Sequence, residues 1–459
     1  MGHRIYILVL EVICAGLMTS CGNSATNSST AHYCIGLTVT GLAGSGLVLQ
    51  ATNATPGTIP ITRNGTYPVV ASLPTGTAYQ VSVKTQPTNP SQICSISNAS
   101  GVVATSNITN IVVSCSNTST STSTGTSTTG PFAFAETTTG IAAYSINSSS
   151  GLLTQVSGSP FAAGSGGAYG VLDPTAPYLY FANMGSGTIS GFSYNSNGLL
   201  TALANSPYSS GAGAYSLAIT PDGKYLYAAN YNAASVSGFA IGTGGTLTSV
   251  TGSPYATGSS GSLPSAVAMD PQGRYIYVAN DADGTVSVFA IGSNGSLTPV
   301  AGSPFTDGGY GSVSLAVDPS GGHLYVVDYY SNSLMSFVVS NTGSLTPLGT
   351  SVSTGNSPRA LTVNPAGNLL YVVNQADATI STYIINSTGT SLSTAAPVPT
   401  GPSPFDIKID SSGQHVYVAN YSGGGTMSVY SAATNGALSA IPNRPYPTGY
   451  GTTSIVLAP

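Results

Sequence analysis

Short runs of aromatic and β-branched residues recur along the chain from residue 131 onward, separated by stretches rich in Gly, Ser, Asn and Pro. Each run ends in Asn or an acidic residue. The runs FAFAE, YLYFAN, YLYAAN, YIYVAN, HLYVVD, LLYVVN and HVYVAN end at Glu136, Asn183, Asn230, Asn280, Asp328, Asn374 and Asn420. Successive ends are 46 to 50 residues apart. Seven copies at this period predict a solenoid or a propeller.

Every copy has the same internal order. A small apolar strand such as 314–318 leads through a turn at 318–321 into the aromatic strand 323–328. A third strand such as 285–291 and a fourth within 295–304 follow in each copy. Four short antiparallel strands per repeat predict a propeller blade.

The two ends of the repeat region complement each other. The region begins at Pro131 inside a blade and lacks a first strand there, whereas the chain ends in the strand-like tail SIVLAP. In this tail Ile455 and Leu457 align with Val267 and Met269 of the fourth copy. We therefore expect an all-β, seven-bladed β-propeller over 131–459, with the C-terminal strand completing the first blade. Closure would shield the sheet edges that an open array exposes.

The region before the repeats predicts a separate small domain. Residues 116–130 carry no charge and no large apolar side chain, which is typical of a flexible Ser/Thr linker. Residues 32–115 contain several short alternating runs and predict a small β-sandwich-like domain. Cys94 and Cys115 lie in two of these runs and are expected to form a disulfide, although Cys34 could compete for either partner.

The N-terminal residues predict a signal for export. Residues 1–21 contain Arg4, then a mostly apolar stretch, then the sequence MTSC. This last sequence resembles a bacterial lipobox ending at Cys21. A lipoprotein signal peptide would place a lipid on Cys21, with residues 22–31 as a polar tether. Glu11 interrupts the apolar stretch, so a plain secretory signal or an uncleaved anchor stays open. The expected location is the bacterial cell envelope, lipid-anchored at the outer membrane or cell surface, with the membrane as partner.

Charge is scarce and excludes several classes of protein. The 459 residues include 8 Lys and Arg and 13 Asp and Glu, about 5% in all. So few basic residues cannot neutralise a phosphate backbone, so we expect no nucleic-acid partner. The 41% apolar content is ample for a core. The sequence offers no His/Cys cluster and no phosphate loop, so neither a metal nor another cofactor is expected.

The repeats resemble a known family. The stretch SAVAMDPQGRYIYVAN (265–280), followed by TVSVFAI and GSLTPVAGSPF, is similar to the YVTN-type, lactonase-like seven-bladed propellers over about 131–459. This resemblance implies the propeller fold. The family includes enzymes that open or form lactones, such as 6-phosphogluconolactonases and carboxymuconate cyclases, and many surface proteins without known activity. Its motifs are therefore specific for fold and weak for function.

In such propellers the loops between second and third strands, and the loops entering each first strand, surround the central channel. We call this side the channel face, and we expect the binding site there. The ligand-binding candidates are Glu136, Asp281, Asp328, Arg359, Tyr231, Tyr329 and Tyr421, with Asp283, Asp377 and Tyr330 nearby. Arg359 stands where other copies have small or aromatic residues, and it would bind an anion or pair with a carboxylate. The recurring Asn residues are expected to bond the loop backbone.

Two functions follow, in different classes. With few charges and no His expected on the channel face, the first is a non-catalytic platform that binds a protein, peptide or glycan. The alternative is a lactonase-like hydrolase or cyclase, for which Arg359 and Glu136 are the weak catalytic candidates. Asp173, Asp222, Asp270, Asp318 and Asp410 are expected to cap turns on the opposite face, next to His323 and His415.

Overall fold

The computed structural model describes residues 32–52, 57–88, 92–117, 130–138, 140–259, 261–386, 389–392, 396–441 and 445–459. The chain divides into two compact units, residues 1–126 and 127–459. The predicted signal peptide, Cys21 and the tether lie outside the described residues. In the part that is described, no helix is long and apolar enough to cross a membrane.

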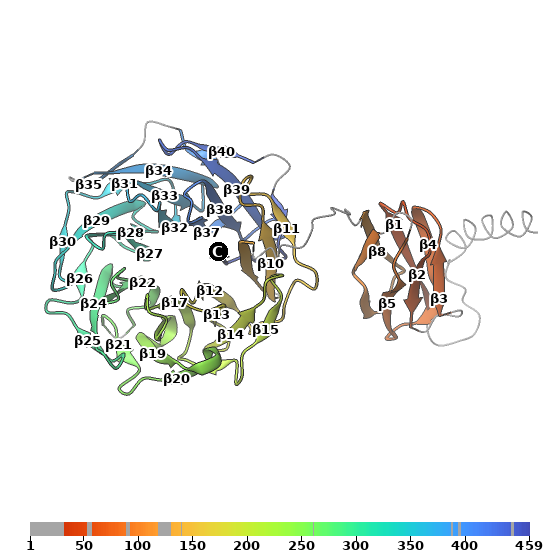
Figure 1. The fold of residues 1–459 in the computed structure, drawn as a ribbon, viewed down its shortest axis with the longest axis horizontal. Helices are drawn as coiled ribbons and strands as arrows, with labels where there is room; N and C mark the ends of the chain where they lie inside the picture. Colours follow the sequence, from red (N-terminus) through yellow and green to blue (C-terminus); the bar gives the residue numbers. More distant parts are fainter. Residues whose placement is uncertain are drawn as a thin grey trace, which may run out of the picture. The chain divides into compact units, whose positions relative to one another are not determined.

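The first unit contains two four-stranded sheets (Figure 1). Their orders are β4-β1-β8-β6 and β3-β2-β5-β7. The strands are β1 (His32–Thr40), β2 (Leu47–Ala51), β3 (Thr58–Ile61), β4 (Gly65–Pro74), β5 (Ala78–Thr85), β6 (Gln92–Ser97), β7 (Ser100–Val102) and β8 (Ile108–Asn117). Alternate residues of both sheets, Leu37 and Leu49 among them, share one buried core. Cys94 and Cys115 are register partners on β6 and β8 and form a disulfide.

The second unit is a seven-bladed propeller, with its blades arranged around a centre (Figure 1). Blade 1 consists of β42 (Ser454–Ala458), β9 (Phe132–Thr137), β10 (Gly140–Ile146) and β11 (Leu153–Gln155). Blade 2 consists of β12 (Gly167–Leu172), β13 (Tyr178–Asn183), β14 (Thr188–Tyr194), β15 (Leu200–Ala202) and β16 (Tyr208–Ser209). Blade 3 consists of β17 (Ala214–Ile219), β18 (Tyr225–Asn230), β19 (Ser235–Ile241), β20 (Leu247–Ser249) and β21 (Tyr255–Ala256). Two short 3₁₀ turns, η1 (Tyr231–Ala233) and η2 (Thr243–Gly245), flank β19.

The other four blades repeat this plan. Blade 4 consists of β22 (Pro264–Met269), β23 (Tyr275–Asn280), β24 (Thr285–Ile291), β25 (Leu297–Pro299) and β26 (Phe305–Thr306). Blade 5 consists of β27 (Ser312–Val317), β28 (His323–Asp328), β29 (Ser333–Val339), β30 (Leu345–Pro347) and β31 (Val352–Ser353). Blade 6 consists of β32 (Pro358–Val363), β33 (Leu369–Asn374), β34 (Thr379–Asn386), β35 (Gly389–Leu392) and β36 (Val398–Pro399). Blade 7 consists of β37 (Pro404–Ile409), β38 (His415–Asn420), β39 (Thr426–Ala432), β40 (Leu438–Ala440) and β41 (Tyr446–Pro447).

The C-terminal strand closes the ring, as the sequence predicts. β42 pairs antiparallel with β9, with Ile455 opposite Ala135. Side-chain acceptors on first strands then tie one blade to the next. Asp406 Oδ2 of blade 7 accepts a hydrogen bond from the Ile455 N–H at 2.9 Å, and Ser454 Oγ of blade 1 accepts one from the Gly170 N–H at 3.0 Å. The seam between the chain ends is thus bonded like other blade boundaries.

The Asn residues that end the second strands bond hydroxyl groups of their own blade. Asn280 Nδ2 donates to Thr285 Oγ1 and Ser287 Oγ at 3.0 and 2.9 Å. The same pair of contacts recurs at Asn183, Asn230, Asn374 and Asn420. The expected bond to loop backbone is found, among the described residues, at Asn374, whose Oδ1 accepts it from the Gly355 N–H. We call Asn183, Asn230, Asn280, Asn374 and Asn420 the Asn column. It fastens the second strand of each blade to the third.

The first blade shows that Glu136 is not a member of this column. The Thr138 N–H bonds Tyr450 O, as the Asp281 N–H that follows Asn280 bonds Leu263 O. Thr137 thus occupies the Asn position of blade 1. Glu136 stands one residue earlier, where other blades have Ala or Val, and in a strand a one-residue step turns the side chain to the other face.

Glu136 consequently points toward blade 2 and is fully buried. Its Oε1 lies against Gly167 of β12, where an added Cβ would come within 2.3 Å. Neither carboxylate oxygen has a hydrogen-bond partner among the described residues. Burial raises the pKa of Glu136 well above its usual value.

Removing the apolar side chain at the seam should weaken the whole ring. Ile455 is fully buried between blades 7 and 1, so Ile455→Ala should lower the free energy of unfolding by about 3 kcal/mol. Leu199 is 38% exposed, and Leu199→Ala should cost less than about 0.5 kcal/mol. Denaturant unfolding of both variants measures the difference. Equal stability of the two would contradict a closed ring.

The buried carboxyl predicts a pH-dependent gain for Glu136→Gln. The raised pKa means that the folded state favours the protonated acid. The contribution of this acid to the stability of the fold is therefore fully present below about pH 4.5, and it is lost as pH rises through the pKa of the folded state. At pH 8 the amide variant should be more stable than the native chain by about 1–3 kcal/mol. The gain should shrink toward pH 4, as measured by denaturant titration. A gain that does not vary with pH would refute this account.

Candidate functional site

The channel face is built from the two loop classes that the sequence indicates. The residue after each second strand donates its backbone N–H to the loop entering the first strand of the same blade. Tyr231, Asp281, Tyr329, Gln375 and Tyr421 do so in blades 3 to 7, at 2.7 to 3.1 Å. The candidates Tyr231, Asp281, Tyr329 and Tyr421 therefore occupy equivalent positions around the channel.

A chain of aromatic rings joins several blades at this face. Tyr231 contacts Tyr215, Tyr215 contacts Tyr169, Tyr169 contacts Phe405 and Phe405 contacts Tyr421, with ring centroids 5.6 to 6.0 Å apart. These rings come from blades 3, 2 and 7. Contacts of this geometry are attractive beyond the apolar area they bury. The channel is thus filled by side chains at this level.

Arg359 of blade 6 joins this cluster. Its guanidinium carbon lies 4.1 Å from the centroid of Phe405, and its Nη2 donates to the Tyr215 hydroxyl. A cation stacked on a ring and bonded to a phenol is held firmly without a counter-ion. Within the described residues no salt bridge includes Arg359, and its buried Nε has no hydrogen-bond partner. Binding of an anion by Arg359 stays a prediction.

Asp281 is the carboxylate that accompanies this cluster. Its Oδ2 accepts a hydrogen bond from the Tyr231 hydroxyl at 3.0 Å. Burial raises the pKa of Asp281, although the Tyr231 hydroxyl and the charge of Arg359 both act to lower it. The side chain is partly exposed, so it can meet a ligand. Tyr329, in the next blade, instead donates to Gln375 Oε1 at 2.9 Å.

The other acidic candidates are buried or serve loops. Asp328 is fully buried and accepts a hydrogen bond from Ser333 Oγ at 2.8 Å. Asp283 accepts bonds from the backbone and hydroxyl of Ser259, and Asp377 accepts bonds from the backbone and amide of Asn356. These two carboxylates therefore fasten the loops that enter blades 4 and 6. Glu136 is fully buried against Gly167 of blade 2.

The histidines of the propeller lie on the opposite face, as expected. His323 Nδ1 is 3.1 Å from Asp318 Oδ2, and His415 Nδ1 is 2.8 Å from Asp410 Oδ2, both at turns between first and second strands. Asp173 likewise caps its turn by accepting the Thr175 N–H at 2.8 Å. No described histidine reaches the channel face.

Exposed tyrosines gather on the channel face. Tyr310, Tyr330 and Tyr450 are 57%, 63% and 65% exposed, and Tyr421 is 36% exposed. All four lie in loops of the two channel-face classes. Tyr310 and Tyr330 of blade 5 contact each other with centroids 5.3 Å apart. Large rings left in water on one face suit a partner that presents flat apolar surface.

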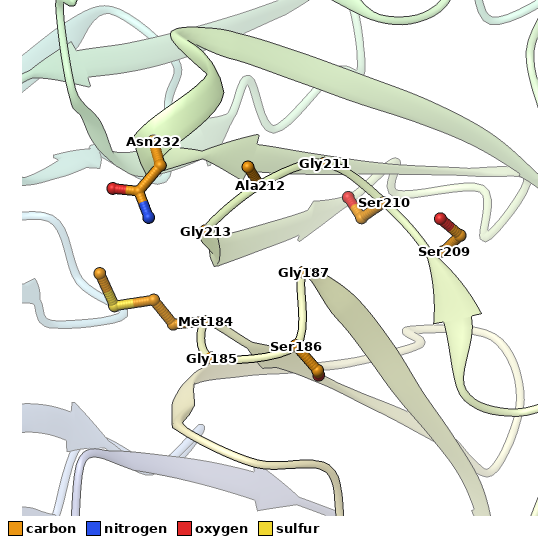
Figure 2. A pocket seen from close by; sticks show the side chains of 10 residues that line it. All are labelled: Met184, Gly185, Ser186, Gly187, Ser209, Ser210, Gly211, Ala212, Gly213 and Asn232. Atoms are coloured by element: carbon orange, nitrogen blue, oxygen red, sulfur yellow. The ribbon is translucent and has the colours of Figure 1, made fainter.

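A shallow cavity opens between blades 2 and 3 on the same face (Figure 2). Its volume is about 410 Å³. The lining has no charged side chain and combines glycine-rich backbone with hydroxyls, one thioether and one amide: Met184, Gly185, Ser186, Gly187, Ser209, Ser210, Gly211, Ala212, Gly213 and Asn232. Figure 2 shows the side chains of Met184 and Asn232 on opposite loops. Such a lining suits a small, uncharged, polar ligand.

Sequence reasoning missed three parts of this site. Tyr169 occupies a first-strand position where most other blades have Ser or Ala, so its size was a usable signal. Tyr215 and Phe405 occupy, in blades 3 and 7, the position that Arg359 has in blade 6, and the repeat pattern gives no sign that the three side chains meet. The cavity is lined largely by glycine and serine, whose recurrence in this composition carries no signal.

The comparisons with known proteins agree with the geometry. No curated protein matches the chain. A putative 6-phosphogluconolactonase from Bacteroides fragilis is 18% identical over 73% of this chain and 100% of its own, with a TM-score of 0.63. The Pseudomonas aeruginosa periplasmic gluconolactonase is 18% identical over 72% of this chain and 99% of its own, with a TM-score of 0.61. At this identity the likeness shows the fold alone.

The family model described as lactonase, 7-bladed beta-propeller, matches residues 128–407, more than half of the chain. These residues include Arg359, Tyr215, Phe405 and the lining of the cavity. The chain therefore belongs to the lactonase-type seven-bladed β-propeller family.

Proposed function

We propose that the chain is a cell-envelope lipoprotein whose propeller binds a neutral glycan on its channel face without catalysing a reaction. The lipobox-like sequence ending at Cys21 supports the anchor, and the Ser/Thr-rich segment supports a spacer between anchor and propeller. The observation that carries the non-catalytic part of this proposal is the engagement of Arg359 by Phe405 and Tyr215.

The same observation weighs against hydrolysis. Opening a lactone needs a base within hydrogen-bond reach of water or substrate and a donor for the developing oxyanion. Glu136 and Asp328 are fully buried, and Asp283 and Asp377 are engaged by loop backbone. Arg359 would have to leave its stacked position to hold a substrate carboxylate.

The chemistry of the exposed face favours a neutral glycan. Tyrosine rings stack on the apolar faces of sugar rings, and Ser, Asn and backbone groups bond sugar hydroxyls. Tyr310, Tyr330, Tyr421 and Tyr450 supply the rings. The uncharged cavity between blades 2 and 3 supplies hydroxyls and an amide. A charged ligand would find few ionic partners here.

Lactone hydrolysis is the second candidate, and two observations favour it. The chain belongs to the lactonase-type family, and the solved neighbours include a gluconolactonase. Asp281 is partly exposed, has a raised pKa and lies within electrostatic range of Arg359, which places an acid–base group next to a cation.

Loss of an exposed ring should weaken glycan binding. On a glycan array, Tyr330→Ala and Tyr421→Ala should each weaken binding to a neutral glycan about tenfold, since buried Tyr contacts at interfaces cost more than about 1 kcal/mol to truncate. Leu199→Ala, an exposed residue outside the channel-face loops, is the matched control and should bind like the native chain. Absence of binding to any neutral glycan by the native chain would overturn the proposal.

A lactone screen separates the two functions. With sugar-acid lactones as probes, the native chain should show no turnover above buffer, because no exposed base faces a free cation. Turnover by the native chain that falls at least 100-fold in both Asp281→Asn and Arg359→Ala would establish the hydrolase instead. Thermal unfolding of both variants checks that they fold.

A further inference from the structure

Blade 5 differs from its neighbours at two positions that meet near the channel face. The Asn column is replaced there by Asp328. The loop entering the blade carries Asp307, where the loops entering blades 3, 4, 6, 7 and 1 carry Ser210, Thr257, Thr354, Thr400 and Thr448. In blade 3 the corresponding hydroxyl donates directly to the column residue, from Ser210 Oγ to Asn230 Oδ1 at 2.8 Å. Blade 5 thus has two acids where blade 3 has a neutral hydrogen-bonded pair.

Both acids are buried and share their surroundings. Asp307 is 3% exposed and Asp328 is fully buried. Ser312 Oγ donates a hydrogen bond to Asp307 Oδ2 at 2.5 Å, and its hydroxyl also acts to lower the pKa of Asp328. Gly309 donates its N–H to Asp307 Oδ1 at 3.1 Å, while the Asp328 carboxylate lies against the same glycine. Asp328 Oδ1 has no hydrogen-bond partner among the described residues.

Among the described residues no cation acts on Asp328. The groups that face Asp328 are Asp307 on the entering loop, Ser312 on β27 and Ser333 on β29. β32 packs against β28 and carries Arg359, whose guanidinium is directed to Phe405 and Tyr215. Two buried carboxylates that both lie against Gly309 and act on each other electrostatically cannot both stay ionised without a large cost. One proton between them restores the donor that Ser210 supplies in blade 3.

We propose that Asp307 and Asp328 share one proton, and that this proton fixes the 307–312 loop and with it Tyr310. The loop is tied to the following hairpin by the Tyr310 N–H to Ser331 Oγ and by the Tyr329 N–H to Gly311 O, at 2.8 and 2.7 Å. It also carries the Tyr310 ring that packs on Tyr330. Loss of the proton leaves two like charges buried against the same glycine and loosens the loop.

The transition falls near neutral pH. Burial, followed by the charge of Asp307, raises the pKa of Asp328 to about 7. Because the folded value exceeds the unfolded one, the stabilisation is fully present below the usual pKa of Asp, about 3.9, and is lost as pH rises to about 7. The blade-5 tyrosine pair is then ordered in mild acid and looser in mild alkali. This inference concerns the unliganded chain and holds whether or not the proposed glycan binds.

Carboxyl-carbon NMR of the full chain labelled at Asp tests the proposal directly, because the sequence has few acidic residues to resolve. We expect one carboxyl of the native chain to titrate near pH 7. That titration should be absent in Asp328→Asn, which places at this position the Asn of other blades. It should move to lower pH in Asp307→Thr, which removes the charge of Asp307 but leaves Asp328 buried. Two carboxyls titrating below pH 5 in the native chain would refute a shared proton.

Stability and exchange give a second readout. Between pH 5 and 8 the melting temperature of the native chain should fall relative to that of Asp328→Asn, and amide exchange at Gly309 and Tyr310 should accelerate over the same range. Asn420→Asp in blade 7 places an acid opposite Thr400, where the atoms nearest Gly401 belong to Asn420 alone, so it is the matched control and its transition should lie below that of the native blade-5 pair. Calcium chloride that raises the melting temperature at pH 8 in the native chain but not in Asp307→Thr would assign the pair to a cation and overturn the proposal.

Discussion

The pairing of β42 with β9 is the constraint on which the rest of the propeller depends. An open array of seven blades would expose one unpaired strand edge at each end, whereas a ring closed within one blade exposes none there. The Asp406 and Ser454 side chains repeat across the seam a bond that Ser216 makes to the Val267 N–H elsewhere. Closure also brings first strands of distant blades face to face. Tyr215 of blade 3 and Arg359 of blade 6 can meet only because the ring is closed.

The fold could be predicted well because it depends on a repeated pattern. The period, the four-strand order and the closing strand all follow from apolar runs that recur at fixed spacing. The error at Glu136 has a physical cause: an isolated acid at the end of an aromatic run looks like the Asn of other copies. Register decides which face a strand residue occupies, and the backbone bond of Thr138 to Tyr450 places Thr137, not Glu136, at the column.

The candidate site was predictable only in part. Periodicity places Asp281, Tyr231, Tyr329 and Tyr421 around the channel, since they share one position of the repeat. It cannot say that Arg359 stacks on Phe405 or that Asp283 bonds Ser259, because these contacts depend on loop conformation and side-chain length. The Asp307–Asp328 pair is hidden for a different reason. Its members are 21 residues apart in sequence and meet only when the loop entering blade 5 folds over β28.

The seam has one more consequence, which concerns the order of the chain. Phe132 and Ala458 are register partners, so the two ends of the repeat region lie side by side in one sheet. A ring whose ends adjoin has no intrinsic beginning: joining them with a short link and opening any turn on the face opposite the channel would preserve every blade. The propeller is in this sense cyclic. Circular permutation would move the point at which the preceding segment joins it without rearranging the channel face.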